Sequence, residues 1–77
     1  MDDDEIVWTQ KDFEGKYANC FRVGFNVFEL VIDFAQYGPE SRIANLHTRI
    51  IVSPGHGRVL VRLLQRSIED LEALIGM

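Results

Sequence analysis

Apolar and polar positions alternate in three segments of the chain, with the period of two that is typical of β-strands. The pattern predicts strands over residues 17–24 and 27–36, paired as an antiparallel hairpin. Gly24-Phe25-Asn26 offers the turn, because glycine and asparagine tolerate positive φ. A third strand is predicted over 43–52, after a loop at 37–42. The β-prone residues 6–9 form a candidate fourth strand.

The faces of the predicted sheet follow from the same alternation. In the second strand, Phe28, Leu30, Ile32 and Phe34 form one apolar face, and Glu29 and Asp33 mark the other. In the third strand, one face is predicted to hold Ala44, Leu46, Thr48, Ile50 and Val52, and the other Asn45, His47 and Arg49.

A helical period begins after the third strand. Ser53 is a suitable N-cap, Pro54 suits the first helical position, and Gly76 suits the C-cap. Gly55 and Gly57 each cost a helix about 1 kcal/mol relative to alanine, so we expect regular helix only from near Arg58. About 22 residues span roughly 33 Å, which is enough to cover one sheet face. We therefore expect the face that contains Phe28 to lie under this helix.

These elements predict an α+β fold: a three-stranded antiparallel meander, with 6–9 as the candidate fourth strand, followed by one long C-terminal helix. Residues 1–12 are predicted to be an acidic flexible arm, and 13–77 a single domain. No apolar run approaches the roughly 18 residues of a membrane span, and no signal peptide is recognisable. A lone cysteine fits a reducing compartment. We therefore expect a cytoplasmic protein.

Charge narrows the choice of partners. The net charge of the 77 residues is −4, but residues 1–14 hold six acids and one base, whereas 15–77 hold six acids and seven bases. The predicted domain is close to neutral and lacks the basic field that nucleic-acid binding usually needs. Exposed aromatic side chains such as Tyr17 and Phe21 could still stack on bases, so single-stranded nucleic-acid binding stays an alternative.

The small size of the chain predicts self-association. A domain of this size buries only about 60% of its unfolded surface, and oligomerisation is a usual remedy. One helix covers one sheet face, and a three-stranded sheet keeps two open edges. We expect a homo-oligomer, most simply a two-fold dimer.

The predicted helix carries the candidate interface. Arg58, Arg62 and Arg66 recur every four residues, and acidic residues follow at 69, 70 and 72, an order that opposes the helix dipole. Three interpretations remain open: an antiparallel helix pair across a dimer axis, a basic stripe for phosphate or an acidic peptide, and a solvated face. Arg66 can also pair with Glu69 or Asp70 within its own helix. The predicted oligomer or partner interface comprises Leu60, Leu64, Ile68, Leu71, Arg58, Arg62 and Arg66.

Catalytic, cofactor and metal motifs are not found in the sequence. His47, His56 and Cys20 do not have metal-ligand spacing. Ser53 has no nucleophile elbow around it, and the proline that follows suits a helix cap. We therefore expect no enzyme activity, no cofactor and no metal site.

Several segments resemble a known family. They are Tyr17-Ala18-Asn19, the run 28–34, the run 49–56, the spaced Leu60, Leu64 and Ile68, and Ile75-Gly76. Over residues 16–76 they resemble the small prokaryotic domain of unknown function family 3467, a resemblance that implies a short strand-and-helix protein and no catalytic residues. The layout is also similar to that of the export chaperone SecB. We expect a non-enzymatic homo-oligomeric protein-interaction module, with a SecB-like holdase for unfolded chains or peptides as an alternative.

Overall fold

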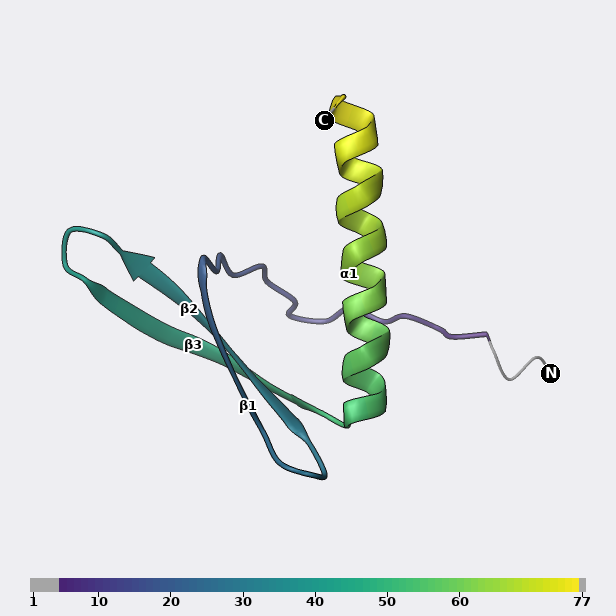
Figure 1. The fold of residues 1–77 in the computed structure, drawn as a ribbon, viewed down its shortest axis with the longest axis horizontal. Coiled ribbons are helices and arrows are strands. Elements are labelled where there is room, and N and C mark those ends of the chain that lie inside the picture. The colour runs from purple at the N-terminus through teal and green to yellow at the C-terminus, as the bar shows by residue number, and fades with distance from the viewer. Residues whose placement is uncertain (1–4, 77) are drawn as a thin grey trace.

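Three strands and one helix make up the regular structure of residues 5–76, the part of the chain that the computed structural model describes. The strands are β1 (Cys20–Phe25), β2 (Leu30–Gly38) and β3 (Ile43–Val52), and the helix is α1 (Pro54–Ile75). The strands form one antiparallel sheet in the order β1-β2-β3 (Figure 1). This is the predicted fold class. Residues 6–9 lie outside the sheet, so the described part of the chain has three strands.

The β1–β2 turn lies later in the sequence than predicted. It occupies residues 26–29 rather than 24–26, and Phe25 pairs with Leu30. Asn26 fixes this position, because its side-chain oxygen accepts hydrogen bonds from the backbone N–H groups of Phe28 (2.7 Å) and Glu29 (3.0 Å). An asparagine side chain that mimics a backbone turn in this way decides where the hairpin closes. Phe28 therefore lies in the turn and not in a strand.

A β-bulge at His47 changes the faces of β3. Phe34 pairs with Thr48, but the next residue of β2, Ala35, pairs with Leu46, so His47 is the extra residue. An extra residue reverses the alternation beyond it. The prediction that Ala44 and Leu46 share a face with Thr48 is therefore wrong: they lie on the opposite face, and His47 lies on the Thr48 side.

The helix begins at Pro54, earlier than the expected start near Arg58. The Ser53 hydroxyl accepts a hydrogen bond from the backbone N–H of His56 at 3.1 Å, as an N-cap does. Packing explains the glycine at position 57, since a Cβ atom there would overlap a methyl group of Leu30 and would lie 3.5 Å from Val52 Cγ2. The first helical turn therefore packs against the end of the sheet more closely than any other residue type would allow. Gly76, at φ 78°, ends the helix as predicted.

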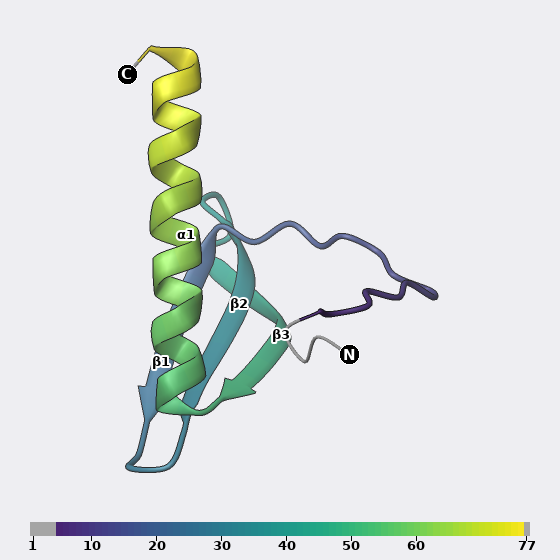
Figure 2. The ribbon, with the colours of Figure 1, turned by 90° about the vertical axis from the view of Figure 1, so that its right-hand side faces the viewer.

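The helix does not cover the sheet, so the expectation that one sheet face lies under it is wrong. A single residue, Ser53, separates β3 from α1, and the Gly57 contact fixes the direction in which the helix leaves. Figure 1 shows α1 standing beside the sheet and joined to it at one end, and Figure 2 shows the same exit from the end of β3. A one-residue connection is too short to turn the helix back over its own strands.

The single chain consequently has almost no core. Among residues 5–76, only Asp33, Ala35 and Gly57 are buried. The chain exposes 7457 Å², whereas a compact monomer of this mass exposes about 4,800 Å². Its radius of gyration is 15.9 Å, against about 11.5 Å for a compact chain of this length. A large apolar surface is therefore left uncovered.

Candidate functional site

One face of the sheet is apolar and uncharged. The strand register places three rows of side chains on it, and we call it the Phe34 face: Phe21, Phe34 and Thr48; Val23, Ile32 and Ile50; Phe25, Leu30 and Val52. Thr48 is the one polar residue of the nine. The rings of Phe21 and Phe34 meet edge to face at 5.7 Å. The exposed fraction is 82% at Phe25, 60% at Val23 and 43% at Ile50, so this face has the composition of a protein core but lies open to solvent.

The helix presents a second uncovered apolar surface, the helix stripe, which comprises Leu60, Leu64, Ile68 and Leu71. Spacings of three and four residues bring these four predicted residues to one side of α1. Leu60, nearest the sheet, is half-buried, but the exposed fraction is 54%, 54% and 53% at the other three. The prediction that they form an interface stays a prediction, and their exposure leaves them free to make one.

The three predicted arginines of the helix lie on its other side. None of Arg58, Arg62 and Arg66 forms an ion pair with another of the described residues. The expected pairing of Arg66 with Glu69 or Asp70 is therefore not formed. The first turn of the helix has no acid and its last turn has no base, so the helix dipole is left uncompensated at both ends.

The opposite face of the sheet, the Asp33 face, carries an ionic cluster that the sequence alone did not predict. The register aligns Arg22, Asp33 and Arg49 in one row across the three strands. Arg49 Nε donates to one carboxylate oxygen of Asp33 at 2.7 Å, and Arg22 Nε donates to the other at 2.8 Å. The hydrogen bonds from Arg49 and then from Arg22 hold the pKa of the Asp33 carboxyl well below its usual range. The alternating pattern placed these residues on polar faces, but only the register shows that they meet.

The role of this cluster is to hold the three strands together, and it is not a promising binding site. Asp33 is 4% exposed and both of its carboxylate oxygens are bonded, so it links the three strands through one buried group. The guanidinium groups point to solvent and carry a net charge of +1 together with Asp33. They lie on the face opposite Phe21 and Phe25, so the sheet does not bring arginines and exposed aromatic rings together as a base-stacking surface would.

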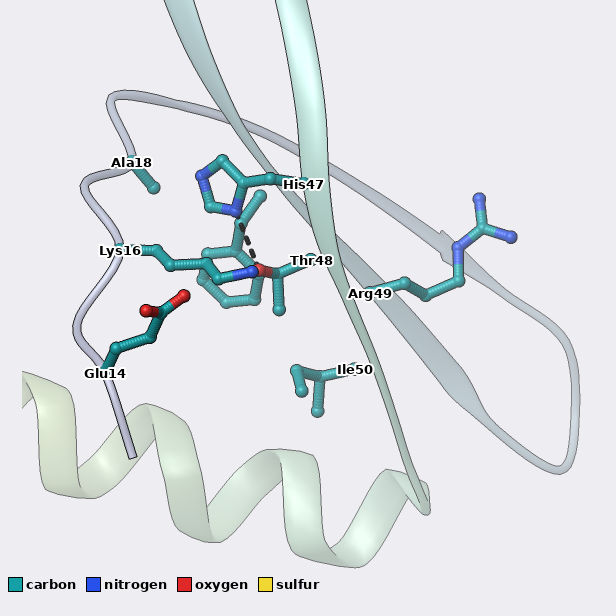
Figure 3. Close-up of a pocket in the computed structure, with 8 residues that line it drawn as sticks. Glu14, Lys16, Ala18, His47, Thr48, Arg49 and Ile50 are labelled. Carbon is teal, nitrogen blue, oxygen red and sulfur yellow. Dashed lines mark hydrogen bonds between the residues drawn. The ribbon is translucent and has the colours of Figure 1, made fainter. Parts of the chain in front are cut away.

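An open hollow of about 550 Å³ lies between the N-terminal segment and β3 (Figure 3). Glu14, Lys16, His47 and Thr48 line it, so a carboxylate, an ammonium, an imidazole and a hydroxyl group share one space. His47 Nδ1 lies 2.7 Å from the Thr48 hydroxyl oxygen, and Nε2 lies 2.9 Å from the carbonyl oxygen of Tyr17. Since a carbonyl only accepts, Nε2 donates to Tyr17, and in the neutral imidazole Nδ1 accepts from the Thr48 hydroxyl. Nε2 thus ties the N-terminal segment to β3, whereas the contact of Nδ1 with the neighbouring Thr48 lies within β3.

The N-terminal segment is extended and exposed before it reaches β1. Residues 5–19 contain no helix or strand, and Ile6, Trp8 and Phe13 are each at least 67% exposed. Where this segment joins the sheet, Asn19 extends the pairing through its side chain, which accepts from Tyr37 N at 2.6 Å and donates to Tyr37 O at 3.2 Å. The predicted acidic arm 1–12 thus also carries exposed apolar side chains, among them Ile6 and Trp8.

The remaining candidate residues do not converge. His56 is exposed in the first helical turn, and Cys20 is a half-buried free thiol on the Asp33 face. Within residues 5–76, no three His, Cys, Asp or Glu side chains are grouped as metal ligands would be. Nor does the described part of the chain include a helix that is both long enough and apolar enough to cross a membrane.

Comparison with known proteins gives one match. No curated protein and no solved structure matches the chain. One family profile matches residues 2–77, which extends the expected resemblance through the N-terminal segment. With nearly the whole length matched, the chain belongs to the family described as Protein of unknown function (DUF3467).

Proposed function

We propose that this chain is a non-enzymatic protein-interaction module that acts as a homo-oligomer. The observation that carries the proposal is the uncovered Phe34 face, which has the composition of a protein core. An exposed apolar patch of more than a few hundred Å² normally marks an interaction site. Here the accessible surface exceeds that of a compact monomer by about 2,600 Å², and the helix stripe adds a second such surface.

The charges of the helix are consistent with a contact between copies. Arginines occupy the first and middle turns of the helix and acids its last turns, and its arginines have no ion-pair partner among the described residues. In an antiparallel pair of helices that meet on this charged side, Arg58 and Arg62 of one copy would lie beside Glu69 and Glu72 of the other, and the helix stripe would stay free for another surface. Each such exposed pair contributes less than about 1 kcal/mol, so these charges would set orientation while the apolar side chains supply affinity.

The molar mass in solution tests this proposal. We expect sedimentation equilibrium or light scattering at micromolar concentration to give a multiple of 8.9 kDa. Leu64→Asp should dissociate or unfold the assembly, because it places a charge in the helix stripe. Gln65→Asp introduces the same side chain one position away and should leave the assembly intact. A stable 9 kDa particle for the natural chain would refute the proposal, as would a well-folded oligomer of Leu64→Asp.

A holdase for unfolded chains is a second candidate, and the aromatic side chains of the N-terminal segment favour it. Trp8 and Phe13 are 86% and 82% exposed and belong to neither the Phe34 face nor the helix stripe. An assembled oligomer would therefore still present apolar groups to a client. If the module acts as a holdase, a client protein that aggregates on heating should stay soluble when the module is present in molar excess, measured by light scattering. Trp8→Ser with Phe13→Ser should abolish that protection without changing the oligomer mass.

A further inference from the structure

We propose that the Phe34 face of each copy is covered by the helix stripe of a second copy, so that two chains exchange their helices reciprocally. This inference rests on the proposed homo-oligomer and specifies which surfaces meet within it. The occupant of the Phe34 face is thus a second molecule of this chain, and the contact is formed twice about a two-fold axis.

The direction of the helix supports this exchange. Ser53 is the one residue between β3 and α1, and Gly57 seats the first turn against Leu30 and Val52. Both features direct α1 away from the strands that precede it (Figure 1). A helix that leaves the end of its own sheet cannot lie along that sheet, but it can reach a sheet related to it by a two-fold rotation.

The two surfaces match each other in chemistry and in length. None of the nine positions of the Phe34 face is charged, and the helix stripe consists of aliphatic side chains. The helix is about 33 Å long, whereas the strand rows from Phe25 to Phe21 extend about 14 Å. One helix is therefore long enough to span these rows and still extend beyond them. In contrast, the Asp33 face presents two exposed arginine side chains, which suit solvent better than an aliphatic stripe.

Two chains also have enough exposed surface to form a stable dimer. Two separate chains expose twice 7457 Å², and a compact particle of twice the mass exposes about 8,000 Å². Forming such a particle would bury about 6,900 Å² in total, well above the roughly 2,000 Å² at which obligate interfaces begin. Even if the N-terminal segments stay extended, a second copy supplies enough contact for a stable dimer.

A mixing experiment with two variants tests the exchange. Leu64→Asp damages the helix stripe, and Ile50→Asp damages the Phe34 face. Each variant alone carries two damaged contacts per dimer. In a mixed dimer, both aspartates fall in the same contact, and the other contact is formed by a natural helix on a natural sheet. We expect each variant alone to be monomeric or unfolded, and a 1:1 mixture to form heterodimers at least about tenfold more tightly than either homodimer.

The readouts are native mass spectrometry, with one variant carrying a mass tag, and recovery of the helical circular dichroism on mixing. Recovery on mixing remains measurable even if each variant is unfolded alone. The matched controls are Gln65→Asp, which replaces an exposed polar side chain at the edge of the helix stripe, and Ile51→Asp, which places the same charge on the Asp33 face. Both should dimerise alone. A milder pair, Leu64→Ala and Ile50→Ala, should show the same preference for the heterodimer in dissociation constants.

The outcomes separate the two proposals. A natural chain that is monomeric refutes both the homo-oligomer and the exchange. A natural chain that is oligomeric, with no preference for the mixed dimer in either variant pair, refutes the exchange alone, because helix-on-helix or sheet-on-sheet contacts gain nothing from mixing. A mixed dimer favoured over both homodimers supports reciprocal helix exchange.

Discussion

Replacing Gly57 by alanine sets two effects of known size against each other. Alanine favours a helix over glycine by about 1 kcal/mol, which would stabilise the protein. The added Cβ, however, would overlap the Leu30 methyl group and lie close to Val52, and overpacking of this kind typically costs about 1–3 kcal/mol. The packing cost should win, because Leu30 and Val52 both lie against this position. We expect Gly57→Ala to lower the free energy of unfolding by up to about 2 kcal/mol.

Gly55 provides the matched control. It lies in the same helical turn, but a Cβ there would have no neighbour within 4 Å. Gly55→Ala should therefore raise the free energy of unfolding by up to about 1 kcal/mol. Urea titrations followed by circular dichroism, at one protein concentration, would measure the difference between the variants. In thermal melts, each 1 kcal/mol should appear as a shift of about 4–8 °C in Tm for a domain of this size.

A double variant tests the assigned cause. If the Leu30 methyl group is the obstacle, Leu30→Ala should relieve the overlap, so that Gly57→Ala is less harmful in a Leu30→Ala chain than in the natural one. The reasoning is wrong if Gly57→Ala stabilises the protein as much as Gly55→Ala does. It is also wrong if the effect of Gly57→Ala is the same with and without Leu30.

Three further predictions address the cap, the ionic cluster and the N-terminal arm. Ser53→Ala should lower the free energy of unfolding by about 1 kcal/mol in urea titrations because it removes the N-cap, and Ser53→Asp should not. The pKa of Asp33 is lowered from its ordinary value of 3.8, so its ion pairs should stabilise the fold fully above that value and progressively less as the pH falls below it. The stability difference between the natural chain and Asp33→Asn should therefore shrink on going from pH 6 to about pH 2.5; a constant difference would contradict the ion-pair assignment. Deleting residues 1–12 should leave Tm nearly unchanged, because residues 5–12 lie outside the sheet and the helix; a fall of several degrees would show that this segment packs on the assembly.

The sequence determined the elements because each has a local cause. Alternation set β3 at 43–52, and Ser53-Pro54 and Gly76 set the two ends of the helix through capping that involves only neighbouring residues. The order of the strands also followed, since short connections make antiparallel neighbours. The exposed helix stripe was visible as a spacing of three and four residues.

The tertiary structure decided what depends on contacts between distant residues. The Asn26 side chain places the turn later in the sequence than alternation predicted, and the bulge at His47 places Leu46 on the face opposite to the predicted one. Both differences arise because register is set by pairing across strands and not by alternation within one strand. The meeting of Arg22, Asp33 and Arg49 depends on the same register. The direction of the helix was the most consequential of these features, because it depends on the Gly57 contact with Leu30, 27 residues away in the sequence. That contact leaves the Phe34 face open.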